Sequence, residues 1–151
     1  MLNRPGSPGQ RPPQAQGGYP QRSYIESPDY LRGGYLDARD NARPELITTE
    51  AQLVAEELAR GRLNYSQIRR FFRKIRFLES RLDAGLPFDD IRAQIASLSP
   101  AAADAVNRKV APQVFRTFID KNVHLSQQGE RSFRHGFVQH FQSVVCYFPR
   151  Q

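Results

Sequence analysis

The strongest constraint on the fold is a run of apolar residues with helical spacing between Leu63 and Leu82. At the start of the run, Asn64 and Gln67 have the spacing of a capping box, and Leu63 and Ile68 occupy the positions of a hydrophobic staple. Residues that recur three or four positions apart lie on one face of an α-helix. The residues that recur in this way are Ile68, Phe71, Phe72, Ile75, Leu78 and Leu82. The sequence therefore predicts a long amphipathic helix with one buried face.

Amphipathic patterns of helical spacing continue on both sides of this helix. We expect the preceding helix to start after Thr48 or Thr49, whose hydroxyl can accept a bond from the first turn, and to end at Gly61 in a left-handed cap. Pro100 is expected at the first position of another helix. Further apolar series follow Pro87, Pro112 and Ser126. Because no long stretch alternates polar and apolar residues, we predict an all-α protein, a compact bundle of five or six helices.

The first 45 residues differ in composition from the rest of the chain. They hold seven of the eleven prolines and six of the ten glycines, and their tyrosines and aliphatic residues follow no period. Such a stretch buries too little apolar surface to offset the entropy lost on ordering. We therefore expect residues 1–45 to form a disordered N-terminal arm, rich in Pro, Gly, Arg and Tyr, and residues 46–151 to form the helical-bundle domain. The arm's arginines and tyrosines, which are spaced by glycine, are also typical of RNA-binding tails, although an ordinary linker explains them equally well.

Positive charge is concentrated in the predicted domain. Residues 1–45 carry six Arg against five acidic residues, and the remainder carries sixteen Lys and Arg against ten acidic residues. A basic folded surface attracts polyanions, so nucleic acid or an anionic membrane is the expected class of partner. No stretch approaches the ~18 uncharged apolar residues of a membrane span, and no signal peptide is recognisable. With Cys146 as the single cysteine, a reducing cytoplasm is the expected compartment.

No arrangement of residues in the sequence indicates catalysis or a cofactor. His135 and His140 are five positions apart and so lie on different sides of a helix, unlike the four-residue spacing of a zinc-binding pair. The adjacent Asp89 and Asp90 diverge around the helix axis and fit the helix dipole better than a metal site. The apolar neighbours of Cys146 predict a buried, unreactive thiol. We therefore expect a protein that is not an enzyme and needs no metal or cofactor.

The helix between Leu63 and Leu82 carries many positive charges on its outer side. Glu79 is the only acidic residue in the interval, and like charges four positions apart repel by roughly a few tenths of a kcal/mol per pair. One stripe consists of Arg69, Arg73 and Arg76, and a second of Arg70, Lys74 and Arg81. Because the planar guanidinium of the five arginines suits phosphate and Lys74 adds a further positive charge, these six residues are predicted to bind the RNA backbone without sequence preference. The alternative is a solvated face whose acidic partners come from another helix.

A second candidate contact with RNA is the pair Arg108 and Lys109, at the end of the alanine-rich segment. Here the alternative is an interaction with the negative end of the helix dipole. Membrane adsorption is disfavoured for the basic helix, because its apolar face is needed for the core.

Residues 64–75 read Asn-Tyr-Ser-Gln-Ile-Arg-Arg-Phe-Phe-Arg-Lys-Ile. This segment, followed by two others in the same order, resembles the small subunit of type III-A CRISPR effector complexes, the Csm small subunit, whose helix reads Ser-Gln-Ile-Arg-Lys-Phe. Leu98, Pro100 and Arg108 are in register with a second family segment, although Ser99 and Ala101 replace lysines and Asp104 replaces a tyrosine. The phenylalanine-rich last helix, which ends in Val144-Val145-Cys146-Tyr147-Phe148, matches a third segment.

The resemblance implies a helical, non-catalytic subunit that stacks in several copies along the guide RNA and target RNA. Its other expected partners are the backbone and large subunits of the Csm complex, and the implied role is antiviral defence. The matching residues for RNA contact are Arg69, Arg70, Arg73, Lys74 and Arg76. Two other hypotheses remain open: a helical protein–protein adaptor whose basic helix docks on an acidic partner, and a DNA-binding regulator, for which no recognition-helix pair is evident.

Overall fold

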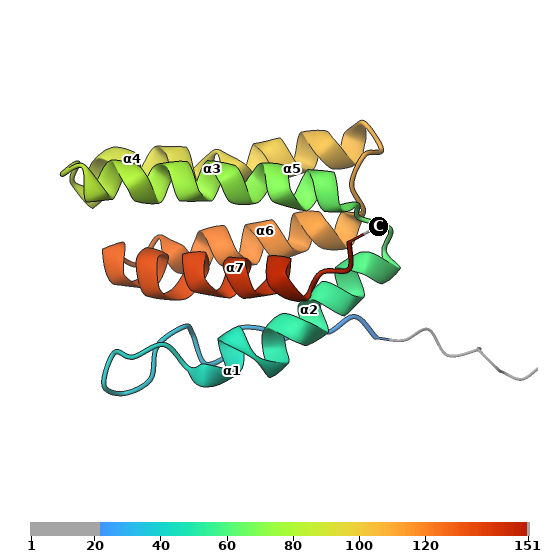
Figure 1. Ribbon diagram of the computed structural model, residues 1–151, viewed down its shortest axis with the longest axis horizontal. Coiled ribbons are helices and arrows are strands. Elements are labelled where there is room, and N and C mark those ends of the chain that lie inside the picture. Colours follow the sequence, from blue (N-terminus) through green and yellow to red (C-terminus); the bar gives the residue numbers. More distant parts are fainter. Residues whose placement is uncertain (1–21, 151) are drawn as a thin grey trace, which may run out of the picture.

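Six helices of nine residues or more make up most of residues 22–150, the part of the chain that the computed structural model describes (Figure 1). A four-residue helix, α1 (Pro44–Ile47), comes before them, and six residues of π-helix, η1 (Ser132–Phe137), lead into the last. The six are α2 (Thr49–Arg60), α3 (Tyr65–Asp83), α4 (Phe88–Ala96), α5 (Leu98–Asn107), α6 (Gln113–Ser126) and α7 (Val138–Tyr147). The predicted all-α bundle of five or six helices is confirmed, since these residues contain no β-strand.

The helices lie in layers (Figure 1). α3 runs beside α4 and α5, and this upper layer contacts α6 and α7, which form the middle of the bundle. α2 crosses α7 on the other side. The core between the layers is rich in phenylalanine, with Phe71, Phe115, Phe118, Phe133, Phe137 and Phe141 all buried. No helix within residues 22–150 combines the length and the hydropathy that crossing a bilayer requires.

The long helix α3 forms as the sequence predicts. Asn64 caps it, because its Oδ1 accepts a hydrogen bond from the backbone N–H of Gln67 at 2.8 Å. The reciprocal bond of a capping box is absent, since Oε1 of Gln67 is buried without a partner. Leu63 and Ile68, the predicted staple, are both buried. The buried face consists of Ile68, Phe71, Ile75, Leu78 and Leu82, with Phe72 half-buried at its edge.

The predicted ends of α2 are right in position, since Thr48 directly precedes the helix and Gly61 directly follows it, but the predicted cap interactions are wrong. The hydroxyl of Thr48 does not cap the helix but donates to the carbonyl of Pro44 at 2.9 Å. At the other end Gly61 has a φ of −76°, and Arg62, one residue later, takes the left-handed conformation with a φ of 73°. Gly61 is instead a point of close approach, because a Cβ there would lie 3.2 Å from Val114. The prediction for Pro100 is also wrong by two positions, since α5 begins at Leu98.

Residues 22–43, here called the strap, are folded against the bundle, so the prediction of a disordered arm is wrong for them. Ile25, Tyr30, Leu31 and Tyr35 are all buried in the common core. Residues 1–21 of the predicted arm lie outside the described residues. A few deeply inserted side chains thus anchor a segment whose average composition is that of a linker. The core therefore extends across the predicted boundary at residues 45/46.

Polar contacts fix the ends of the strap. The ammonium of Lys121 donates to the carbonyls of Ile25 and Ser27, at 2.8 Å each. The backbone N–H of Ile25 donates to Glu57 on α2 at 3.0 Å. Arg43 at the other end forms an ion pair with Glu50 at 2.9 Å. Because these partners satisfy strap backbone groups that no helix pairs, the strap can lie on the bundle without a regular structure.

Tyr35 of the strap inserts beside η1, where only glycine leaves enough room. A Cβ on Gly136 would lie 2.2 Å from Cγ of the Tyr35 ring, closer than any real contact. The Tyr35 hydroxyl donates to the side-chain oxygen of Asn122 on α6 at 2.7 Å. Gly136 therefore makes the socket for this ring.

A chain of buried hydrogen bonds joins the strap to α6 and α7. Nδ1 of His140 lies 2.7 Å from the Leu46 carbonyl, which can only accept, so Nδ1 carries the proton. Nε2 is then the acceptor for the Tyr30 hydroxyl, also at 2.7 Å. The oxygen of that hydroxyl accepts in turn from the amide of Asn122 at 2.9 Å. Burial lowers the pKa of His140 to about 4, which keeps the ring neutral.

Candidate nucleic-acid interface

The predicted basic residues of α3 point away from the core and flank its exposed side. Arg70, Arg73, Lys74 and Arg76 are exposed, whereas Arg69 and Arg81 are half-buried. Arg69, Arg73 and Arg76, the first predicted stripe, border a groove between α3 and α7. Arg73 also borders a second groove with Lys74, between α3 and the α4–α5 pair. The structure thus brings the first stripe together around one site.

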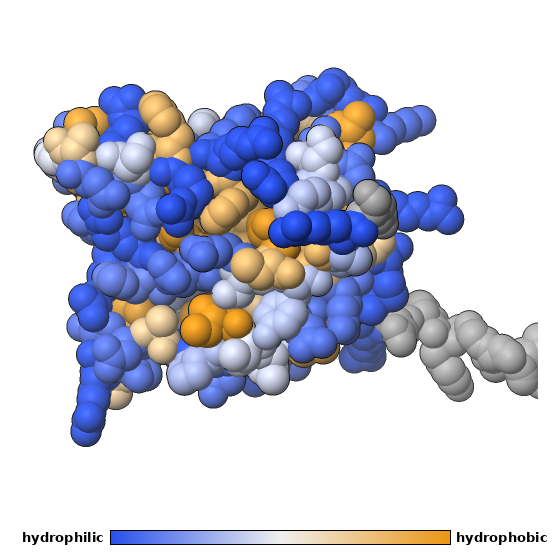
Figure 2. All heavy atoms as spheres, in the orientation of Figure 1, coloured by the Kyte–Doolittle hydropathy of each residue, from blue (hydrophilic) through white to orange (hydrophobic). Residues whose placement is uncertain are grey.

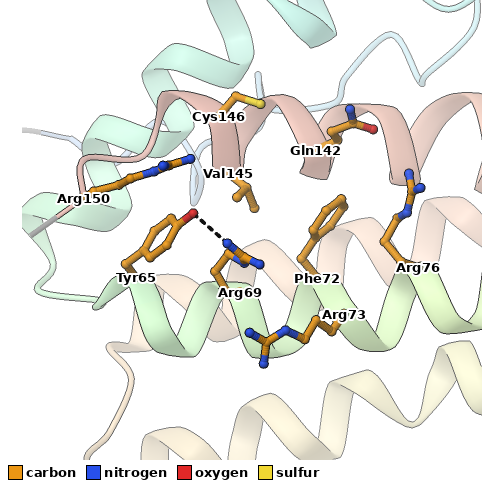
Figure 3. Close-up of a pocket in the computed structure, with 9 residues that line it drawn as sticks. All are labelled: Tyr65, Arg69, Phe72, Arg73, Arg76, Gln142, Val145, Cys146 and Arg150. Atoms are coloured by element: carbon orange, nitrogen blue, oxygen red, sulfur yellow. Dashed lines mark hydrogen bonds between the residues drawn. The ribbon is translucent and has the colours of Figure 1, made fainter.

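The groove between α3 and α7, here called the α3–α7 groove, has a volume of about 500 Å³. In Figure 3, Phe72 and Val145 point into the space between the two helices, and Arg76 reaches from α3 toward α7. Gln142 and Cys146 of α7 line the opposite edge. Figure 2 shows apolar atoms over this space with hydrophilic side chains around them. The site therefore combines an apolar floor with a cationic rim.

Tyr65 closes one end of the groove between two guanidinium groups. Its hydroxyl accepts a hydrogen bond from Arg69 at 3.0 Å, the dashed line in Figure 3. The guanidinium carbons (Cζ) of Arg69 and Arg150 lie 5.5 and 5.2 Å from the centre of the Tyr65 ring. The bond from Arg69 lowers the pKa of the Tyr65 hydroxyl from its usual value, because it stabilises the phenolate. Positive charge is thus gathered tightly at this end.

Little negative charge offsets these arginines. Of the six basic residues predicted on α3, only Arg76 lies within 4 Å of a carboxylate of the described residues, Glu79 at 3.5 Å. The alternative in which acidic residues of another helix neutralise the face is therefore not observed in residues 22–150. Because like charges repel at this spacing, an anionic ligand would relieve the repulsion.

The second groove carries an aromatic residue among the basic ones. Its volume is about 430 Å³, and Leu78 and Leu98 form part of its floor. Phe77 on its edge is 57% exposed, more than any other large hydrophobic residue described. The guanidinium carbon of Arg81 lies 5.7 Å from the centre of the Phe77 ring. Together with the apolar floor of Leu78 and Leu98, the exposed ring makes this groove a candidate contact surface.

The other predicted pair, Arg108 and Lys109, lies apart from the α3–α7 groove. Arg108 forms an ion pair with Asp104 of its own helix at 2.9 Å, so part of its charge is already compensated. Lys109 has a φ of 63° and borders a third groove together with Arg62 and Asn64, near the start of α3. Their role in RNA contact stays a prediction.

Sequence reasoning missed the residues that α7 and the C-terminal segment supply. Arg150 and Gln142 join the site only because α7 lies along α3, and no local pattern indicates this. Tyr65 had a signal, since it stands four positions before Arg69 and can meet it on one helix face. The prediction of a buried Cys146 is wrong, because its thiol is exposed.

The histidines and acidic residues form no metal site in the described part of the chain. No group of three or more His, Cys, Asp or Glu residues there is arranged to hold an ion. His135 is exposed, whereas both ring nitrogens of His140 are engaged in the buried chain. The acidic pair Asp89 and Asp90 lies in the first turn of α4, where it complements the helix dipole.

Comparison with known families identifies the chain. The family model for Csm2 Type III-A matches residues 41–150. The chain belongs to the Csm2 family. No curated protein and no solved structure gives a further match. The resemblance found in the sequence is thereby confirmed, and the chain is a small subunit of a type III-A Csm complex, in which it functions with other Csm subunits.

The family match places the described features in two groups. All six long helices and the α3–α7 groove lie within the part that is matched to Csm2. The strap lies outside the match over residues 22–40, although its tyrosines are bonded to α6 and α7. The bundle core of this Csm2 chain thus includes residues from outside the matched range.

Proposed function

We propose that this Csm2 subunit holds guide or target RNA by its phosphate backbone, through Arg69, Arg70, Arg73, Lys74 and Arg76 of α3. The observation that carries the proposal is the row of arginines around the α3–α7 groove with almost no acidic partner. A guanidinium group offers two parallel donors to a phosphate and keeps its charge at any physiological pH. Contacts of this kind give affinity without reading sequence.

The wider role that we propose follows the family. The subunit is non-catalytic, and several copies stack along the guide RNA and target RNA in the cytoplasm, next to the backbone and large subunits, in antiviral defence. Family membership supports this role. Arg81, Arg108 and Lys109 are proposed as secondary contacts, weaker for Arg108 because Asp104 competes for it.

A protein–protein adaptor is the second candidate function. Phe77 favours it, because an aromatic ring that is 57% exposed beside Lys74 and Arg81 suits an acidic, partly apolar protein surface. The two functions share Arg73, Lys74 and Arg81, but Arg69 and Arg76 border only the first groove and Phe77 only the second, so variants of these residues can separate them.

The test replaces Arg69, Arg73 and Arg76 together with glutamine and measures RNA binding by fluorescence anisotropy over a range of salt concentrations. If each arginine neutralises one phosphate of single-stranded RNA, the slope of log K against log salt becomes less steep by about 2, at about 0.7 per phosphate. We expect affinity at low salt to fall by at least about tenfold, with circular dichroism unchanged.

The matched control replaces Arg32, Arg92 and Arg116 with glutamine. It removes the same charge, but each of these arginines already has an acidic neighbour, namely Asp29, Asp89 and Asp120. The control should bind RNA nearly as the wild type does. Equal loss in both variants would mean that net charge alone drives binding, and no loss in the first variant would refute the proposed surface.

A further inference from the structure

We infer that the α3–α7 groove receives a single unstacked RNA base while the phosphates beside it rest on the arginine rim. The inference rests on the proposed RNA binding and adds to it the form of the ligand, which is single-stranded RNA with its bases available.

The shape of the groove is the first argument. Its volume of about 500 Å³ lies within the range of ~300–1,000 Å³ typical of small-molecule sites. Phosphate contact alone needs no such hollow, because arginines on a flat or convex helix face would serve. A flat, largely apolar group is what the hollow can take in.

The floor is the second argument. Phe72 is only half-buried: one face of its ring stacks on Phe141, with ring centres 5.6 Å apart, and the rest lines the groove beside Val145. Aromatic side chains of this kind stack on bases of any identity, which suits binding without sequence preference. Gln142 at the edge offers both a donor and an acceptor to the rim of a base.

The rim gives the third argument, which concerns the class of ligand. Four guanidinium groups line the groove and no carboxylate does, so a neutral or basic side chain of a protein partner would be poorly matched. Arg69 and Arg150 lie at one end, beside Tyr65, and Arg76 extends toward α7 (Figure 3). An RNA strand that crosses the rim can place one phosphate near Arg69 and Arg150 and another near Arg76, with a base between them in the groove. A duplex keeps its bases stacked inside and would leave the apolar floor uncovered.

The test compares two ligands with the same phosphate spacing and charge: a short oligouridylate and an abasic ribose-phosphate chain of equal length. The full-length protein should bind the oligouridylate at least about fivefold more tightly, the lower bound for stacking of one base. Equal affinities for the two chains would overturn the inference.

The thiol of Cys146 gives a second readout at the outer edge of the groove. It is exposed, belongs to a residue that lines the groove, and is the only thiol in the chain, so its alkylation by iodoacetamide is unambiguous. Saturating oligouridylate should slow the alkylation at least about fivefold more than the saturating abasic chain does. The same rate with both ligands would place the base elsewhere and overturn the inference.

A conservative variant tests the floor. Phe72→Leu keeps an apolar side chain but removes the ring, and it should bring the affinity for oligouridylate down to that for the abasic chain. Phe88→Leu is the matched control, since Phe88 is also half-buried and packs on a core ring, Phe133, but does not line the groove. If Phe72→Leu still prefers the oligouridylate to the abasic chain as the wild type does, or if both variants lose this preference equally, the groove is not the site of the base.

These results are distinct from failure of the proposed function. Suppose that the arginine variant loses binding to both the oligouridylate and the abasic chain, while the wild type binds the two equally. Backbone binding is then supported and the base site is refuted. If the arginine variant binds both ligands as the wild type does, the proposed backbone binding and the base site are both refuted. Protection of Cys146 by another Csm subunit without RNA would make the groove a protein contact.

Discussion

Acidification should destabilise this protein through one buried side chain, His140. The ring is neutral in the folded state because its pKa is lowered from 6.5 to about 4 by burial. In the unfolded chain the ring binds a proton near pH 6.5. Between these two pH values the unfolded state binds a proton that the folded state does not bind. The free energy of unfolding therefore falls as the pH drops from about 6.5 toward 4.

The size of this effect follows from the pKa difference. A lowering from 6.5 to about 4, at about 1.4 kcal/mol per unit, corresponds to about 3 kcal/mol of unfolding free energy in total. About 2 kcal/mol of this is lost between pH 7 and pH 5. Such a loss is a large fraction of the roughly 5–15 kcal/mol that stabilises a typical domain.

Urea unfolding followed by circular dichroism at several pH values measures the effect, with His140→Leu as the reference. The variant leaves the Tyr30 hydroxyl and the Leu46 carbonyl without their ring partner, so it is less stable at pH 7. It lacks the titration, however, and the carboxylates are common to both proteins. The stability gap between wild type and variant should therefore narrow by about 2 kcal/mol from pH 7 to pH 5. A constant gap would refute the assignment of a neutral, buried ring.

Two further substitutions test the packing and the cap. Gly136→Ala would place a methyl group 2.2 Å from the Tyr35 ring, so we expect a loss of about 1–3 kcal/mol in urea unfolding and faster proteolysis within the strap. Unchanged stability and protease resistance would show that the site around Gly136 can accommodate a methyl group beside the Tyr35 ring. Asn64→Ala removes the only side-chain bond to the first turn of α3 and should cost about 1 kcal/mol, whereas an unaltered urea midpoint would mean that the staple alone holds this end.

The parts of the fold that sequence reasoning predicts correctly depend on neighbours in the chain. The start of α3 is such a case, because the Asn64 cap and the spacing of the apolar residues act within a few positions. The buried face of α7 is also readable from spacing, yet Cys146 is not, since one step along a helix turns a side chain by about 100°. Val145 on one side of it faces the core, and Cys146 faces solvent.

The parts that it misses depend on surfaces made by distant segments. The strap has no period of its own, and its order comes from sockets that α6, η1 and α7 form only after folding. Tyr35 needs Gly136 and Asn122, which lie about a hundred positions away. The arginines of the candidate site were predicted from α3 alone, but the hollow that they border needs α7, and Arg150 enters it from the far end of the chain.

The folded unit is larger than the part of the chain that matches the Csm2 family model. The family match begins at residue 41, whereas Tyr30 and Tyr35 fill the bundle from outside that range and satisfy buried polar atoms of Asn122 and His140. A fragment trimmed to the family boundary would open two ring-sized holes and leave Oδ1 of Asn122 and Nε2 of His140 without partners. Truncated, domain-swapped and fused forms of this subunit therefore have to keep the whole strap and begin at or ahead of residue 22.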